Sequence, residues 1–233
     1  YTRQEGGLLL SIREPVVEWC DSVGLSGARK TPASPLPKHP EPKDGTPGAR
    51  PLQPEEQAVY NRIVGILIYI AKLHFEVAQA AAWLGSARAR ATKHHLDLAK
   101  RAMLFCLGVS SRGLLLRRSR RRLGPSEVLL FWSDTDWATC PHTRRSMTSV
   151  VAFFYGMLLM LTSNKQKGVA LSSTQAETIG MSEAAKKIVP ARRLAKSVRL
   201  HLPPTVLHCD NSAAKAISEC QIKLTSLMRH IAV

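Results

Sequence analysis

The sequence predicts an α/β fold with a mixed sheet and flanking helices, preceded by a small helical subdomain. After Gly124–Pro125, strand-like segments are followed by a long helix, a further strand and a further helix, an order typical of such a sheet. Upstream, residues 55–107 have helical patterning, and eight of the fourteen prolines lie between Pro32 and Pro54. The expected domain organisation is therefore an N-terminal segment (1–26), a proline-rich linker (27–54), a helical subdomain with a basic run (55–123) and an α/β domain (124–233).

The composition indicates a basic globular protein with a polyanionic partner. The 233 residues, 45% of them hydrophobic, are enough for a sizeable core in one or two domains. The formal net charge of +16 favours nucleic acid, because each Lys or Arg paired with a phosphate releases condensed counterions. An acidic membrane surface would also attract the chain, so the charge alone does not name the partner.

The cysteines indicate a reducing compartment. They are odd in number, widely spaced and without a CxxC pair, which favours neither a zinc cluster nor a disulfide framework. No basic-then-apolar signal peptide opens the chain, so we expect an intracellular protein, cytoplasmic or nuclear and not secreted. The first residue is Tyr1, which we interpret as a sign of a fragment or a processed piece. The five cysteines are Cys20, Cys106, Cys140, Cys209 and Cys220.

The first half of the chain is expected to be mainly helical. Residues 8–25 predict a strand and a short helix. The proline-rich residues 27–54 predict an extended linker or a long irregular loop, not a packed element. Residues 55–85 predict a helix that is apolar on most faces, with a break near Lys72–His74.

A second amphipathic helix, residues 92–107 with Thr92 as N-cap, leads into a strongly basic segment. Between Ser86 and Leu123, eleven basic residues stand against one acid, Asp97. Such a run is most often a solvated face, but the net charge makes contact with nucleic acid an equal alternative. The arginines expected to contact nucleic acid are Arg112, Arg117, Arg118, Arg120, Arg121 and Arg122.

The second half of the chain predicts strands and helices in α/β order. Pro190 falls inside the long helix and should kink it or end it early. The expected strands are 127–133, 147–155, 157–163, a further short strand at 168–172, and 205–209, and the expected helices are 174–200 and 211–220.

The stretch Met147–Ser163 is uncharged and mostly apolar. It is shorter than the roughly 20 residues that a membrane-spanning helix needs, and Gly156 lies in its middle. Its β-branched and aromatic residues favour strands, so two strands that turn near Gly156 are expected, with a membrane span as the alternative.

Three acids fall at comparable places in these elements. Asp134 ends the first strand, Glu177 lies in the first turn of the long helix, and Asp210 ends the later strand. Each has an ordinary structural role available: solvation at a strand end, interaction with the helix dipole, or helix capping by Asp210 or Asn211. Together they predict carboxylates that converge at one end of a mixed sheet, a set of hard oxygen ligands that suits Mg²⁺.

Longer motifs carry a family resemblance. "SDTDWATCPHTRRSMTSVVAFFYG", "LTSNKQKGVALSSTQAETIGMSEAAK" and "HCDNSAAKAI" resemble the ribonuclease H domain of copia-type retrotransposon Pol polyproteins. Upstream, "VGLSGARKTPASPLP", "YNRIVGILIYIA" and "HLDLAKRAMLFCLG" are similar to the same polyproteins, in the region that connects the reverse transcriptase to ribonuclease H. The resemblance covers most of the chain, from about residue 8 onward, and implies a ribonuclease H-like fold.

The resemblance also implies a reaction and its site. Asp134, Glu177 and Asp210 match the family's catalytic carboxylates, which hold two Mg²⁺ or Mn²⁺ ions and hydrolyse the RNA strand of an RNA–DNA hybrid. Asp134 would bridge both ions, and the other two acids would hold the leaving-group metal. Asp136 is expected to support the site or face solvent, and Trp137 to pack. Lys165 and Asn211 are further candidates for nucleic-acid contact.

The chain also departs from the family pattern. The family's fourth carboxylate falls where this chain has Ala232, in "RHIAV", and the chain stops before the family's closing helix. Thr178 replaces the usual tyrosine after the helix glutamate. We therefore expect weakened hydrolysis. The alternative hypotheses are a non-catalytic nucleic-acid-binding remnant of a copia-like Pol, with the rest of the polyprotein as a further partner, and a small membrane protein built on Met147–Ser163.

Overall fold

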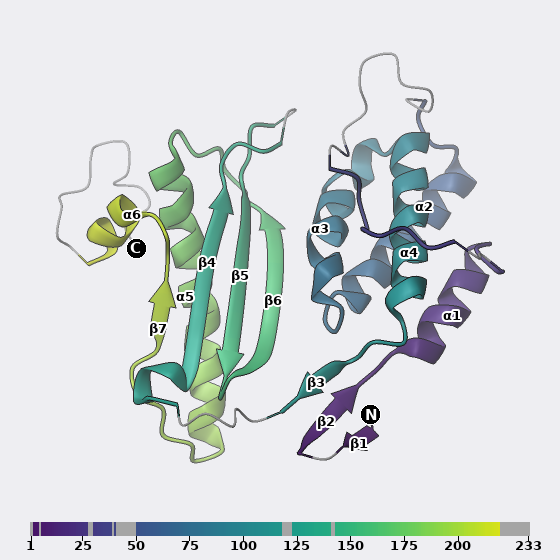
Figure 1. Cartoon of the computed structure of the whole chain (residues 1–233). Helices are drawn as coiled ribbons and strands as arrows, with labels where there is room; N and C mark the ends of the chain where they lie inside the picture. The colour runs from purple at the N-terminus through teal and green to yellow at the C-terminus, as the bar shows by residue number, and fades with distance from the viewer. Residues whose placement is uncertain are drawn as a thin grey trace. The chain divides into compact units, whose positions relative to one another are not determined.

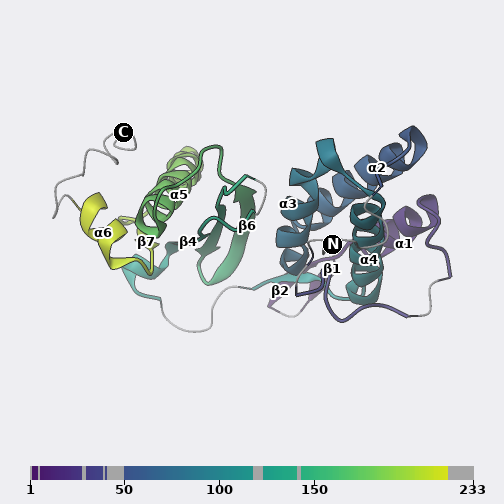
Figure 2. The ribbon, with the colours of Figure 1, turned by 90° about the horizontal axis from the view of Figure 1, so that it is seen from above.

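The computed structural model describes residues 2–4, 6–27, 30–38, 40, 50–117, 123–140 and 143–219. The chain divides into two compact units, Tyr1–Leu116 and Arg117–Val233, and each is described by itself (Figures 1 and 2). The structure is of mixed α/β class, with a mixed sheet and flanking helices, as the sequence predicts. This arrangement is compatible with a ribonuclease H-like fold.

Unit 1 is mainly helical, and the predicted helices and the break between two of them are confirmed. The chain leaves the helical conformation after Ile70 and resumes it in a short 3₁₀ turn at Phe75–Val77. The helices are α1 (Arg13–Ser22), α2 (Pro54–Ile70), α3 (Ala78–Ser86) and α4 (Lys93–Val109), with a second 3₁₀ turn at Arg88–Arg90.

The core of unit 1 forms around one face of α2. Tyr60, Ile63, Val64, Leu67 and Ile70 recur every three or four residues, so they lie on one side of the helix, and all are fully buried. The Tyr60 hydroxyl donates a hydrogen bond of 2.7 Å to the carbonyl oxygen of Leu84, which satisfies the polar end of this buried ring. Packing of this face against α3 and α4 holds the unit together.

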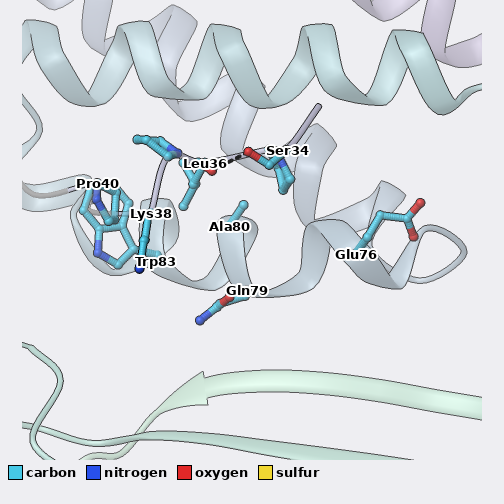
Figure 3. Close-up of a pocket in the computed structure, with 10 residues that line it drawn as sticks. Ser34, Leu36, Lys38, Pro40, Glu76, Gln79, Ala80 and Trp83 are labelled. Carbon is cyan, nitrogen blue, oxygen red and sulfur yellow. Dashed lines mark hydrogen bonds between the residues drawn. The ribbon is translucent and has the colours of Figure 1, made fainter. Parts of the chain in front are cut away.

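The described residues of the proline-rich segment before Pro54, where α2 begins, form an irregular loop, as predicted, and some of them contact the helices of unit 1. The Thr31 side chain lies so close to Gly108 of α4 that a Cβ atom at Gly108 would come within 2.6 Å of it. The carbonyl oxygen of Pro40 lies 2.8 Å from the His94 ring. Figure 3 shows Leu36, Lys38 and Pro40 with Trp83 of α3 in the lining of a pocket of about 340 Å³.

The sequence reading missed one small sheet. Strands β1 (Thr2–Gln4), β2 (Gly7–Leu10) and β3 (Leu114–Leu116) pair antiparallel in that order. A side chain at Gly113 would meet the carbonyl oxygen of Leu10 at 2.6 Å, so glycine permits the close approach of β2 and β3. Strand β3 is formed by Leu114–Leu116, the apolar residues inside the predicted basic run.

Unit 2 contains a four-stranded sheet in the order β6-β5-β4-β7. Strand β4 pairs antiparallel with β5 and parallel with β7, so the sheet is mixed as predicted. The strand expected at 168–172 is wrong, because these residues form an irregular loop before the long helix. The elements are a 3₁₀ turn (Pro125–Glu127), β4 (Leu129–Asp136), β5 (Met147–Phe154), β6 (Met157–Lys165), α5 (Ser173–Ser197), β7 (Val206–His208) and α6 (Ser212–Ser218).

The apolar stretch Met147–Ser163 forms the hairpin of β5 and β6, which confirms the predicted pair of strands. The turn residues Tyr155 and Gly156 have φ values of 50° and 77°. Positive φ at both central residues is typical of tight hairpin turns, and glycine adopts it without steric cost. In the part of the chain that the structure describes, no helix has the length and apolar character to cross a membrane.

Helix α5 continues past Pro190 to Ser197, so the prediction of an early end is wrong. Proline lacks the N–H that would bond the carbonyl of Lys186, one turn earlier. Both residues are exposed, so water can satisfy that carbonyl. The helix loses one hydrogen bond on its solvent side and keeps its packed side intact.

The packed side of α5 consists of small residues. Ala176, Gly180 and Ala184 recur at four-residue spacing and are buried against the sheet. A Cβ atom at Gly180 would lie 2.5 Å from Thr135 Oγ1 and 2.9 Å from Ser133 Oγ. The absence of a side chain at Gly180 therefore sets how closely α5 approaches β4.

We predict that Gly180→Ala lowers the free energy of unfolding by about 1–3 kcal/mol, because the added methyl group overpacks the contact with β4. The matched control is Gly65→Ala in α2, where the space around the glycine is open. That substitution should stabilise the chain by about 0.5–1 kcal/mol through helix propensity. Urea unfolding curves measure both changes, and a Gly180→Ala chain as stable as the unmodified one would contradict the close approach.

Candidate metal centre

Parallel pairing of β4 with β7 brings Asp134 and Asp210 to the same end of the sheet. The pairs are Leu130 with Val206 and Trp132 with His208. The same register, continued by two residues, places Asp210 level with Asp134. Both acids are exposed, and both line a shallow pocket of about 280 Å³ at the carboxyl ends of these strands.

Glu177 approaches this end of the sheet from α5. Its side chain is only 5% exposed, and its Oε1 accepts a 3.0 Å hydrogen bond from the backbone N–H of Thr135. Trp132 is the last residue of β4 that pairs with β7, and Thr135 lies beyond it. The Glu177 carboxylate therefore takes the place of a strand partner for the Thr135 N–H. The hydrogen bond fixes one oxygen of Glu177 and leaves Oε2 directed toward the end of β7.

Cys209 lies between the acids, and the sequence reading did not include it in the site. Its Sγ is 3.7 Å from Glu177 Oε2. One ligand atom from each of Glu177, Cys209 and Asp210 lies within 4.8 Å of the other two. The signal in the sequence was only its position directly before Asp210, because a lone cysteine has no spacing pattern.

Burial, with a contribution from nearby acids, raises the pKa of Glu177, Asp136 and Cys209. Burial is the main cause of the raised pKa of Glu177; the Thr135 N–H opposes it, and the charges of Asp210 and Asp134 add to it. Burial, followed by the charge of Asp134, raises the pKa of Asp136. The pKa of the Cys209 thiol is raised mainly by burial, with the neighbouring acids contributing. The thiol therefore stays protonated at neutral pH and donates to Glu177.

The donor set suits a hard divalent cation. Carboxylates that lie close together repel one another, so a cation between them is strongly favourable. Mg²⁺ and Mn²⁺ prefer oxygen ligands. A soft metal such as Zn²⁺ would require the thiolate of Cys209, and the raised pKa of this thiol disfavours that form. Glu177 and Asp210 therefore fit part of a magnesium or manganese site, and Asp134 lines the same pocket as Asp210 but lies outside their close cluster.

Three residues near the acids, Trp132, Trp137 and Asn211, make contacts that hold the surrounding structure in place. Trp132 stacks on His208, with ring centroids 5.0 Å apart, and forms one wall of the pocket. Trp137 is 46% exposed, and its indole N–H donates to the carbonyl oxygen of Ala170, so it anchors the loop before α5 instead of packing in a core. Asn211 is the N-cap of α6, since its side chain accepts a hydrogen bond from the Ala214 N–H.

The described residues predicted to bind nucleic acid belong to both units. Arg112 follows α4 in unit 1, and Arg117 is the first residue of unit 2. Within unit 2, Lys165 and Asn211 lie at opposite edges of the sheet. The Lys165 ammonium group donates to Cys140 Sγ at 3.1 Å. The predicted contacts of Arg118, Arg120, Arg121 and Arg122 lie outside the described residues, as does Ala232 at the position of the family's fourth carboxylate.

The chain is similar to retrotransposon Pol polyproteins. It is 28% identical over 231 residues, 97% of its length, to a retrovirus-related Pol polyprotein from transposon RE1 of Arabidopsis thaliana. It is 27% identical to that from transposon RE2 of the same plant, over 75% of the chain, and 27% identical to that from transposon TNT 1-94 of Nicotiana tabacum, over 69%.

These homologues are copia-type Pol polyproteins, which supports an origin of the chain in a copia-like Pol, as its motifs predict. The chain spans 15% of the length of the first polyprotein and 12% of the other two. No protein-family model matches the sequence, and no solved structure matches it.

We predict that stability in EDTA falls as the pH rises above the ordinary glutamate pKa, about 4.3, toward the raised pKa of Glu177. In that range the folded state retains a proton that the unfolded state has lost, so ionisation favours unfolding. Glu177→Gln should remove this part of the slope while keeping an oxygen to accept the Thr135 N–H. Thermal unfolding between pH 4 and 8 measures it, with Glu183→Gln on the same helix as control. Identical slopes in all three chains would contradict the burial of a charge at Glu177.

Proposed function

We propose that this chain is the connection and ribonuclease H part of a copia-like Pol polyprotein, and that unit 2 hydrolyses the RNA strand of RNA–DNA hybrids. Similarity to Pol polyproteins over 97% of the chain supports the origin. One observation supports the activity: Asp210 shares a pocket with Asp134 at the carboxyl ends of β4 and β7, and offers an oxygen within 4.8 Å of one from Glu177. Acids of this type at such a place are the parts that a two-metal nuclease requires.

The three acids would hold two Mg²⁺ or Mn²⁺ ions, which supply the activated water and stabilise the leaving oxygen. The residues around them keep the ligands in place. The Thr135 N–H orients Glu177 through Oε1, and the Cys209 thiol donates to Oε2, so neither oxygen rotates freely. Pre-oriented ligands reduce the cost of assembling the site when substrate binds.

The activity should be weak, because Ala232 stands where the resembling family has a fourth carboxylate. That acid serves the metal that activates the attacking water. Losing one ligand of a metal costs several kcal/mol of transition-state stabilisation, at about 1.4 kcal/mol for each tenfold change in rate. Binding of the hybrid should depend on the basic residues of the chain and not on this acid. Affinity and rate can therefore be separated by experiment.

We predict slow cleavage of a labelled RNA–DNA hybrid by the purified chain in Mn²⁺, and no cleavage by Asp134→Asn. Asp136→Asn is the matched control, because it removes a charge from the same face of β4 two residues further on and should keep most of the activity. Product analysis on denaturing gels measures the rates, and Asp134→Asn prepared in parallel excludes cleavage by a contaminating nuclease.

The binding data decide between the two candidate functions. Hybrid binding should weaken steeply with salt in all three chains, because it depends on released counterions. If the unmodified chain binds the hybrid and cleaves none of it in either metal, the chain is a non-catalytic binding remnant. If the unmodified chain cleaves the hybrid as fast as a ribonuclease H with all four carboxylates, the acid missing at Ala232 is not important for the rate.

We also predict that Mn²⁺ raises the melting temperature of the chain. A ligand present at about ten times its dissociation constant stabilises the folded state by about 1.4 kcal/mol. Asp210→Asn should abolish the shift, and Asp136→Asn should retain it. Thermal unfolding with 0, 1 and 10 mM Mn²⁺, at about neutral pH, measures the effect; an equal shift in the Asp210→Asn chain would place the ion elsewhere.

A further inference from the structure

Cys209 offers the proposed metal site a ligand of a different chemical kind. One ligand atom from each of Glu177, Cys209 and Asp210 lies within 4.8 Å of the other two. Cys209 and Asp210 also line the pocket of about 280 Å³ at the carboxyl ends of β4 and β7, so an ion that enters this pocket meets both side chains. The cluster therefore combines two hard oxygen ligands with one soft sulfur ligand.

Two atoms of the cluster have the spacing of ligands around one tetrahedral ion. Cys209 Sγ lies 3.7 Å from Glu177 Oε2. A zinc ion binds thiolate sulfur at about 2.3 Å and carboxylate oxygen at about 2.1 Å, so two such ligands at a tetrahedral angle stand about 3.6 Å apart. An ion would take the place of the thiol proton, between two atoms that the fold already holds at the required separation.

The fold positions the ligands without help from an ion. The Thr135 N–H fixes Oε1 of Glu177, and Oε2 is directed toward Cys209. Cys209 directly follows the last residue of β7, so the pairing of β7 with β4 places its backbone. Asp210 is exposed, and its side chain can turn toward an ion without leaving a core. Three protein ligands at the edge of a pocket leave the fourth position of a zinc ion to water.

The sulfur atom decides which ion gains most from this cluster. Mg²⁺ and Mn²⁺ prefer oxygen ligands, whereas a thiolate selects Zn²⁺. The raised pKa of the free thiol leaves the cluster to a hard cation as long as no zinc is present. A thiol that coordinates zinc is deprotonated by the ion itself, so binding forms the S–Zn bond and releases one proton to solvent. Since Glu177 and Asp210 serve both kinds of ion, zinc and the hard cation exclude each other.

We propose that Glu177, Cys209 and Asp210 bind one Zn²⁺ ion, and that this ion displaces the hard cation and inhibits hydrolysis at the same site. Zinc binding rests on the ligand types and their distances. Inhibition rests on the proposed function, because a site must work with Mg²⁺ or Mn²⁺ before a competing metal can inhibit it.

The test is titration of the purified full chain with Co²⁺, which replaces Zn²⁺ in tetrahedral sites and absorbs in the near ultraviolet when a thiolate binds it. We expect this absorption in the unmodified chain and its loss when Zn²⁺ is added. Millimolar Mn²⁺ should lower the apparent affinity for Zn²⁺, because the two ions share ligands. A chain without the thiolate absorption overturns the proposal, and a zinc affinity that Mn²⁺ does not change overturns the shared ligands.

Variants locate the ion. Cys209→Ser keeps the size of the side chain and a donor for Glu177, and it should abolish the absorption. It should also weaken Zn²⁺ binding more than tenfold, since even the outer partners of a metal site contribute roughly tenfold. Asp210→Asn should weaken binding by a similar factor. The control is Cys140→Ser, which removes a thiol of unit 2 outside the cluster and should change neither reading. A Cys209→Ser chain that binds Zn²⁺ as tightly as the unmodified chain overturns the proposal.

The same chains separate this proposal from the proposed function. In the cleavage assay, Zn²⁺ should inhibit the unmodified and Cys140→Ser chains at lower concentration than Cys209→Ser, each compared with its own rate without zinc. If zinc binds through Cys209 and no chain cleaves the hybrid, the proposed function alone fails. If the hybrid is cleaved and zinc binding does not depend on Cys209, the zinc site alone fails.

Discussion

Unit 2 depends on the close contact between α5 and β4. Because residue 180 is glycine, the helix approaches the hydroxyl groups of Ser133 and Thr135 closely. Glu177 lies three residues earlier on the same face of the helix, so the same spacing lets its carboxylate reach the Thr135 N–H. A wider separation would remove the acceptor of this N–H and release the carboxylate from the end of the sheet. One packing contact therefore sets both the core of the unit and the orientation of its buried acid.

The second constraint is the parallel pairing of β4 with β7, which adds Asp210 to the acids at this end. Folding gains nothing from bringing like charges together, and the raised pKa of Glu177 records that cost, after the larger effect of burial. Cys209 offsets part of it by donating to Glu177 Oε2. A divalent cation would offset far more, since opposite charge favours the ionised form of all three carboxylates. The arrangement is costly as structure, and the proposed cation would offset that cost.

Features that depend on local sequence pattern could be predicted, and features that depend on contacts between distant segments could not. The strands of the β5–β6 hairpin were predictable because Gly156 marks the turn between two apolar runs. The position of Asp134 and Asp210 at one end of the sheet followed from the order of strands and helices, since strands that run in the same direction end at the same edge. The pairing of β1, β2 and β3 was missed because these strands have three or four residues and one pairing joins segments about a hundred residues apart. The contact of the proline-rich segment with Gly108 was not predicted, because it leaves no mark in the composition of the segment.

Charge determines what can approach the acidic end of the unit 2 sheet. The chain as a whole carries +16, but the pocket where β4 and β7 stop presents the carboxylates of Asp134 and Asp210, which repel a phosphate backbone. A polyanion can approach that end only after cations have neutralised it, so metal and nucleic acid should bind there cooperatively.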